Sequence, residues 1–303
     1  MAKITDLHLI SQWAQAFLFD RKVSGFTPET VTNYRNKMKR FGLYCDQINI
    51  SHIEQITPTI LRGFLELLES DGLTVIGRHG HYAALKTFLF WYEREVEPPG
   101  WTNPIRKVKP PKVPEAPIQP IPMPDVMQII NKCPSDLRGL RDKAIFLTLV
   151  DTGIRASELL QLDMDDLVME QGSLLIRHGK GNKTRKVYLG KVGRKMLKRY
   201  LALREDDANA LFISVDDKAR LTYSGLRWLV INRSKDADVK PRGVHTFRRL
   251  HALTMLRNGV DVITLSRLMG HSTSEVLKRY LAQTDEDLRV AHLKFSPVDH
   301  LSL

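Results

Sequence analysis

Ten of the fifteen prolines in the chain fall between Pro98 and Pro124, and this stretch limits the fold more than any other. Proline has no backbone N–H and clashes with the preceding turn of a helix, so such a run suits neither a helix nor a central strand. Basic side chains are interspersed among the prolines: Arg106, Lys107, Lys109 and Lys112. We therefore expect an extended, semi-rigid basic linker over residues 98–123, with one domain before it and another after it.

The sequence pattern of residues 1–97 predicts a small bundle of four helices. Thr27-Pro28 and Thr57-Pro58 each place a capping threonine before a proline at the first helical position, and Thr74 provides a further start. Apolar residues at helical spacing extend these segments. The predicted helices cover residues 5–22, 28–44, 58 to at least 67, and 74–92. Short connections between helices of this length favour a bundle.

Two of these helices carry basic side chains that could contact DNA phosphates or could equally form a solvated face. On the second helix these are Arg35, Lys37, Lys39 and Arg40, and on the fourth they are Arg78, His79, His81 and Lys86.

Residues 124–284 predict a second domain that is mainly helical with a small β-hairpin. A helix from Leu137 ends at Thr152-Gly153, and another begins at once. Two strands, 174–177 and 185–189, are joined by a loop with Lys180 near its tip. Further helices are expected over residues 191–203, 223–231, 246–257 and 262–269. Ser272 and Glu275 form a capping box, so a last helix should start there and carry Tyr280.

The net charge of +12 and the pI near 9.7 favour a polyanionic ligand such as DNA or RNA. At 303 residues the chain can build two cores. It has no apolar run of membrane-spanning length and no signal-peptide pattern, so we expect no membrane association. Cys45 and Cys133 are too few for a disulfide framework, which indicates a reducing cytoplasm.

Several residues of the second domain are of types that can bind a phosphate. Arg155 lies just past a glycine turn, where a helix start favours an anion. His245 and Arg248 are three residues apart and share a helix face. Two guanidinium groups can clamp one phosphate through paired hydrogen bonds. Taken singly, each residue has an ordinary structural explanation: an ion pair between Arg155 and Glu158, a helix cap at His245, an exposed turn at Lys180, a core position at Tyr280.

Together these residues resemble the tyrosine recombinases, or phage integrase family. Five motifs occur in the family's order: Thr152-Gly153-Ile154-Arg155-Ala156-Ser157-Glu158-Leu159, Gly179-Lys180-Gly181-Asn182-Lys183, His245-Thr246-Phe247-Arg248, Gly270-His271-Ser272, and Tyr280. The resemblance implies a helical core-binding domain and a catalytic domain that form a C-shaped clamp around double-stranded DNA.

The resemblance also implies catalytic roles. Tyr280 would attack the scissile phosphate to give a 3′-phosphotyrosyl intermediate and a free 5′-hydroxyl. His245 would act as general base or proton shuttle, and Arg155 and Arg248 would stabilise charge on the non-bridging oxygens. Lys180 would protonate the leaving oxygen. His271 would hydrogen-bond the phosphate.

Glu158 would orient Arg155 or the active-site fold, a less specific assignment. No cofactor or metal is expected, because the histidines lack zinc-ligand spacing.

Two features depart from the family's commonest pattern. Arg249 follows Arg248 where a histidine is usual. The tail, residues 285–303, does not resemble that of housekeeping Xer recombinases and could dock in a neighbouring protomer or pack on its own domain. We expect a mobile-element integrase that acts as a tetramer on paired sites. The alternatives are a Xer-like resolvase of chromosome or plasmid multimers, a type IB topoisomerase, and a non-catalytic DNA-binding regulator.

Overall fold

The computed structural model describes residues 9–114, 119–177 and 184–270, together with residues 289, 292–294, 296 and 298. The chain divides into two compact units, residues 1–115 and 116–303, and each is described by itself. Across the described ranges, no helix combines the length and the apolar character that a membrane span requires.

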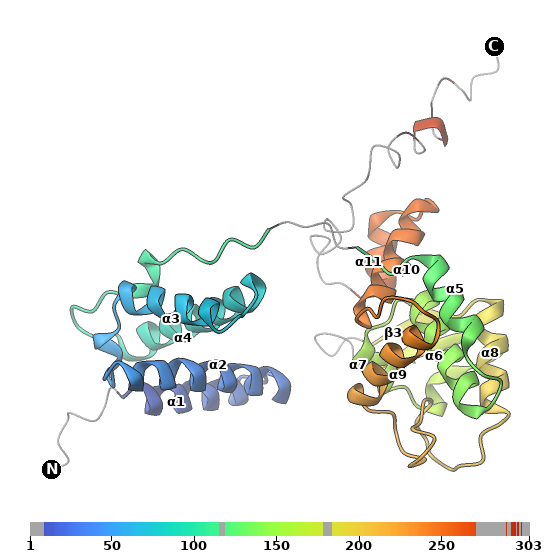
Figure 1. Ribbon diagram of the computed structural model, residues 1–303, viewed down its shortest axis with the longest axis horizontal. Helices are drawn as coiled ribbons and strands as arrows, with labels where there is room; N and C mark the ends of the chain where they lie inside the picture. The colour runs from blue at the N-terminus through green and yellow to red at the C-terminus, as the bar shows by residue number, and fades with distance from the viewer. Residues whose placement is uncertain are drawn as a thin grey trace. The chain divides into compact units, whose positions relative to one another are not determined.

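The first unit contains the four predicted helices, α1 (Ile10–Val23), α2 (Pro28–Gln47), α3 (Pro58–Ser70) and α4 (Val75–Val96) (Figure 1). Each predicted threonine cap is present: the Thr27, Thr57 and Thr74 hydroxyls accept hydrogen bonds from backbone amides three residues ahead, at 3.2–3.3 Å. These bonds satisfy amides that a helix start leaves free, so the helices begin where the sequence predicts.

The core of this unit is aromatic. Phe17 meets Phe88 edge to face with a centroid separation of 5.5 Å, and Phe41 meets Phe64 in the same way at 5.1 Å. These rings are fully buried and come from all four helices. Such pairs add packing energy beyond their buried area, which fixes the helices against one another.

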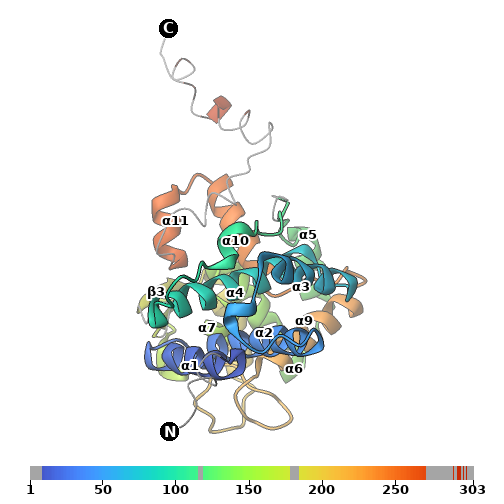
Figure 2. The ribbon, with the colours of Figure 1, turned by 90° about the vertical axis from the view of Figure 1, so that its left-hand side faces the viewer.

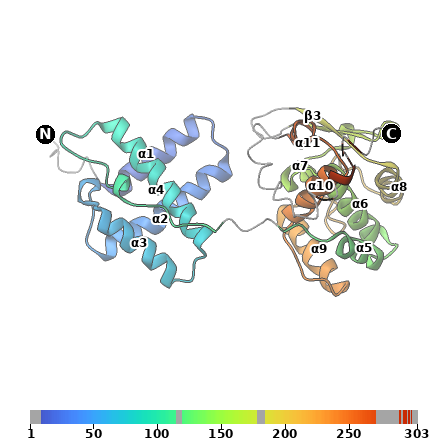
Figure 3. The ribbon, with the colours of Figure 1, turned by 90° about the horizontal axis from the view of Figure 1, so that it is seen from above.

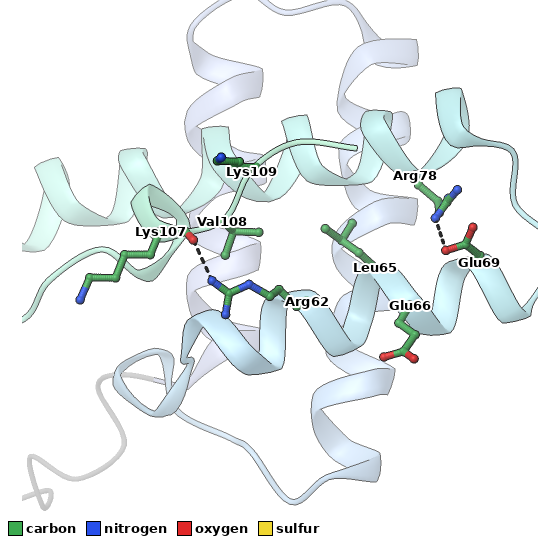
Figure 4. Close-up of a pocket in the computed structure, with 8 residues that line it drawn as sticks. All are labelled: Arg62, Leu65, Glu66, Glu69, Arg78, Lys107, Val108 and Lys109. Carbon is green, nitrogen blue, oxygen red and sulfur yellow. Dashed lines mark hydrogen bonds and ion pairs between the residues drawn. The ribbon is translucent and has the colours of Figure 1, made fainter. Parts of the chain in front are cut away.

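The prediction of an extended linker is wrong for residues 101–108. Pro104–Lys107 forms a short 3-10 helix, and Ile105 and Val108 are buried in the core of the first unit. The Tyr82 hydroxyl donates to the Val108 carbonyl at 2.9 Å, and Arg62 donates to the Lys107 carbonyl at 2.9 Å (Figure 4). A 3-10 turn tolerates proline at its first position, and the apolar side chains between the prolines supply the burial that holds the segment.

The second unit has seven helices in its described part: α5 (Met123–Lys132), α6 (Leu137–Thr152), α7 (Ala156–Leu160), α8 (Lys191–Leu201), α9 (Tyr223–Asp236), α10 (His245–Arg257) and α11 (Val262–Met269). Helix α6 is the centre of this unit, with α5, α8 and α10 packed against it. Its buried residues include Ile145, Phe146 and Leu149. Helices α10 and α11 lie side by side (Figures 1 and 2).

A small antiparallel sheet completes the second unit, in the order β1 (Leu167–Val168), β2 (Ser173–Ile176), β3 (Arg185–Tyr188). Strands β2 and β3 are the predicted hairpin, in a register that pairs Leu174 with Val187. Strand β1 was not predicted. The mainly helical fold class with a small sheet is confirmed. The hairpin tip with Lys180, the predicted helix after Ser272 and most of the tail lie outside the described residues.

Candidate active site

Two glycine turns organise the site in the second unit. Helix α6 ends at Gly153 in the left-handed conformation, with φ of 59°, and α11 ends in the same way at Gly270, with φ of 65°. A side chain at Gly153 would place its Cβ 2.4 Å from Cδ2 of His251. Glycine is therefore needed at this turn for its backbone conformation and for space. The turn brings Arg155 to the start of α7.

Arg155 is held at both ends of its guanidinium. Its Nη1 donates to Glu158 Oε1 at 2.7 Å, and its Nη2 donates to the Gly270 carbonyl at 3.3 Å. The Glu158 side chain is 2% exposed, whereas that of Arg155 is 22% exposed. Glu158 Oε2 also accepts the Arg155 backbone N–H at 2.8 Å. The guanidinium therefore has a fixed position and an accessible edge.

Arg185 on β3 is a site residue that the sequence analysis missed. Its Nη1 and Nη2 donate to the two carboxylate oxygens of Glu158 at 2.9 and 2.7 Å, and its Nε donates to the Leu268 carbonyl at 3.2 Å. Arg185 shares a strand face with Val187, which is buried. A charge on the buried face of a strand requires a partner, and this pattern is the signal that could have identified Arg185.

The pKa of Glu158 reflects this arrangement. Burial by itself would raise that pKa, but hydrogen bonds from Arg185 and from the backbone and side chain of Arg155 outweigh burial and lower it from 4.5 to about 2. Glu158 is thus ionised at any physiological pH. It is a permanent anchor for two guanidinium groups, of which Arg155 is the more exposed, at 22% against 13% for Arg185.

Arg248, one turn into α10, joins the two glycine turns. Its Nη1 donates to the Gly153 carbonyl, and its Nη2 donates to the Met269 carbonyl at 2.8 Å. Arg155 and Arg248 therefore bond to the carbonyls of consecutive residues, Gly270 and Met269, which brings their guanidinium groups to the same turn. The sequence predicted that these two arginines act together, and the structure places them together.

His245 is the first residue of α10 and belongs to the exposed residues. Partial burial of its ring lowers its pKa, and the positive charges of Arg249, Arg248 and Arg155 lower it further. The imidazole is therefore neutral at pH 7 and able to accept a proton. His245 and Arg248 are three residues apart on α10, so the two side chains share one face of the helix.

Three predicted site residues, Lys180, His271 and Tyr280, lie outside the described residues. The described part of the site comprises two oriented guanidinium groups and a neutral imidazole. Such a set binds a phosphate and can move a proton next to it. Within the described ranges, no group of three or more His, Cys, Asp or Glu residues is placed to hold a metal ion.

The basic residues of the first unit have a different character. Arg40 pairs with Asp71 at 2.7 Å. Arg78 pairs with Glu69 at 2.5 Å, and both line a hollow between α3 and residues 107–109 (Figure 4). His81 is buried, and burial, together with the charges of Lys37 and Arg40, lowers its pKa to about 4. The positive charges of Arg40 and Arg78 are thus balanced by acidic residues of their own unit. Arg35, Lys39 and Lys86 are exposed.

Comparisons with known proteins identify the family of this chain. The model of the phage integrase family matches residues 121–287, and that of the phage integrase N-terminal SAM-like domain matches residues 10–96. Tyrosine recombinase XerA of Thermococcus onnurineus is 31% identical over 204 residues, covering 67% of this chain and 71% of the relative. Tyrosine recombinase XerC 2 of Ralstonia nicotianae is 29% identical over 301 residues, covering 94% and 86%.

Solved structures share the fold. The Tn1549 transposon integrase in complex with a circular intermediate DNA has a TM-score of 0.76 at 16% identity, covering 95% of this chain and 99% of that one. A lambda integrase tetramer bound to a Holliday junction has a TM-score of 0.73 at 15% identity, covering 91% and 78%. The chain therefore belongs to the phage integrase family, that is, to the tyrosine recombinases.

Proposed function

We propose that this tyrosine recombinase cuts and rejoins double-stranded DNA at specific sites through a 3′-phosphotyrosyl intermediate on Tyr280, and that it serves the integration and excision of a mobile element. The observation that carries the chemistry is the pair of guanidinium groups, Arg155 and Arg248, anchored on consecutive carbonyls beside a neutral His245.

In the proposed reaction the phenolic oxygen of Tyr280 bonds to phosphorus as the bond from phosphorus to the 5′-oxygen breaks. A phenol ionises near pH 10, so His245 accepts its proton. Lys180 protonates the departing 5′-oxygen. The phosphotyrosyl ester retains the energy of the original bond, and a 5′-hydroxyl restores the DNA by the reverse attack without ATP.

The two arginines stabilise the charge that develops on the non-bridging oxygens. Because Glu158 and backbone carbonyls already hold both guanidinium groups, little reorganisation is needed in the transition state. His271 adds a hydrogen bond to the phosphate. No cofactor or metal has a part in this reaction.

The domains follow from the same proposal. Residues 1–97 act as the core-binding domain and residues 124–284 as the catalytic domain, and both bind duplex DNA. Four copies act on two paired sites in the cytoplasm, and residues 285–303 dock in a neighbouring protomer. The similar lambda integrase structure is a tetramer bound to a Holliday junction, which supports this assembly.

A Xer-like role in resolving chromosome or plasmid multimers is the second candidate, because the curated relatives named above carry Xer names. The two roles differ in the target. We would incubate the protein with DNA from the flanks of its own gene and with DNA from the rest of its chromosome, and isolate detergent-resistant protein–DNA adducts. Adducts on the flanks support a mobile-element integrase, and adducts at one distant chromosomal site support a resolvase. Tight binding without any adduct would favour a non-catalytic regulator and refute the proposed chemistry.

A further inference from the structure

Helix α8 of the second unit carries five basic residues and no acidic residue in its eleven positions. We call this set the α8 basic face: Lys191, Arg194, Lys195, Lys198 and Arg199. Arg194 is half-buried and the other four are exposed. Their spacing of three and four residues places them along one side of the helix. None of the four exposed side chains has an ion-pair partner within the described part of the chain.

This charge pattern opposes helix stability at the start of α8, whereas Lys198 and Arg199 in the last turn favour it. Lys191 and Arg194 lie in the first turn, where the helix dipole disfavours positive charge. Lys191 and Lys195, Arg194 and Lys198, and Lys195 and Arg199 are like-charge pairs four residues apart, which also destabilise a helix. A merely soluble surface would interleave both signs of charge. A face of one charge sign with like-charge pairs along its length fits a surface that binds a polyanion.

The face surrounds a preformed hollow of about 370 Å³ between α8 and the turn before β2, lined by the five basic residues, Met169 and Glu170. Arg194 is fixed at its wall. Its Nη1 donates to the Glu170 carbonyl at 3.0 Å, and its aliphatic chain covers Gly172 so closely that a Cβ there would lie 2.4 Å from the Arg194 Cδ. The Nε of Arg194 is buried and has no hydrogen-bond partner among the described residues.

The α8 basic face lies apart from the catalytic arginines. In Figures 1 and 3, α8 and α7 lie on opposite sides of α6, and α8 packs against α6. Arg155 is at the start of α7. The phosphates that contact α8 would therefore be different from the one that contacts Arg155.

We propose that the α8 basic face binds the phosphate backbone of duplex DNA outside the segment held at the active site. From Lys191 to Arg199 the face extends about 12 Å along the helix, comparable to the width of the major groove, so its ends can reach phosphates on both strands. Arg194 supplies an oriented guanidinium and the lysines supply mobile charges, a combination that binds backbone without reading sequence. The inference rests on the proposed function in that it takes DNA as the ligand.

The test compares the wild-type protein with Lys195→Gln/Lys198→Gln and with a matched control, Lys22→Gln/Lys132→Gln, which removes two exposed charges elsewhere. The probes are two duplexes from the flank of the gene: a short one that just spans the site, and a long one that extends beyond it on both sides. Binding constants are measured over a range of salt concentrations.

Each lost phosphate contact reduces the slope of log K against log salt by about 0.9, so the α8 variant should lose about 2 from its slope on the long duplex. Its slope on the short duplex and its rate of adduct formation there should match wild type, and the control should match wild type on both. An unchanged slope on the long duplex overturns the inference. An equal loss on both duplexes also overturns it, since the face would then contact the active-site DNA.

A third outcome would identify a different occupant. If the α8 variant changes the sedimentation of the protein without DNA, the face binds a second copy of the chain, and the inference fails. Equilibrium binding requires no cleavage. An absence of adducts on every DNA would therefore count against the proposed function and leave the salt slopes to decide this inference separately.

Discussion

Replacing Arg185 by leucine should destabilise the second unit and impair the site together, because it removes two of the four hydrogen bonds that Arg155 and Arg185 donate to a buried carboxylate. Glu158 would keep the hydrogen bonds from the side chain and the backbone N–H of Arg155 but would lose the two from Arg185, at 2.9 and 2.7 Å. The Leu268 carbonyl would lose its donor as well. The turn at Gly270, against which Arg155 and Arg248 are positioned, would then be less firmly held.

The burial of Glu158 sets the magnitude. Arg185 and Arg155 together lower its pKa from 4.5 to about 2, which corresponds to about 3 kcal/mol in favour of the ionised form, shared between the two arginines. Breaking a buried ion pair by removing one partner typically costs about 3–5 kcal/mol. We therefore expect Arg185→Leu to lower the free energy of unfolding by about 3–4 kcal/mol at pH 7. Arg138→Leu, which breaks an exposed pair with Asp216, should cost about 1 kcal/mol or less.

The variant should also change the response to acid. In the wild-type protein, ionised Glu158 contributes stability that is fully present above pH 4.5 and is lost only as the pH falls through about 2. Without Arg185 the pKa of Glu158 rises, because burial then opposes ionisation with less compensation. The variant should therefore lose this stability at a higher pH than wild type.

Urea denaturation followed by circular dichroism at pH 7 and at pH 4 measures both effects. A double variant, Glu158→Leu/Arg185→Leu, separates stability from catalysis. Removing both charges should restore much of the lost stability, but Arg155 would have no carboxylate anchor and DNA cleavage should stay low. A loss below 1 kcal/mol in Arg185→Leu, or recovery of cleavage in the double variant, would refute the reasoning.

Three further predictions concern other parts of the molecule. Arg248→Lys keeps the charge but cannot bond both the Gly153 and Met269 carbonyls, so cleavage should fall about 10²- to 10³-fold while DNA affinity, from filter binding, changes little. Gly270→Ala should cost about 1–2 kcal/mol in urea denaturation, because φ is positive and a Cβ would lie 2.9 Å from the Arg185 Nε; equal stability would contradict this account. His81 has a pKa of about 4, below its ordinary 6.5. As the pH falls, the unfolded chain therefore takes up a proton at this residue before the folded protein does, and the free energy of unfolding decreases by up to about 3 kcal/mol between pH 6.5 and 4. Fluorescence of the tryptophans in the first unit reports this fall, which His81→Gln should reduce.

The helix starts could be predicted from the sequence because their causes are local. A threonine cap and a proline at the first position act within four residues, and Thr27 and Thr57 both behave as expected. The turn at Gly153 is local in the same sense. The sequence therefore also predicted that Arg155 lies just past the end of α6.

The packing of residues 101–108 and the role of Arg185 could not be predicted in this way, because each depends on partners far along the chain. Val108 packs into the first unit, where the Tyr82 hydroxyl donates to its carbonyl. In the second unit, Arg185 is held in place by Glu158, which lies twenty-seven residues earlier and neutralises its charge. Strand β1 has two residues and exists only through its pairing with β2. Periodicity within a segment carries no information on such partners.

The most direct test of the central claim is to identify the amino acid that becomes linked to DNA. A detergent-resistant adduct would be digested with trypsin and nuclease and analysed by mass spectrometry. Cleavage after Arg279 and Arg289 releases a peptide of residues 280–289 that begins with Tyr280. The account predicts that this peptide carries a nucleotide through its 3′-phosphate, and that Tyr280→Phe forms no adduct. A nucleotide on any other residue, or an adduct that persists in Tyr280→Phe, would contradict it.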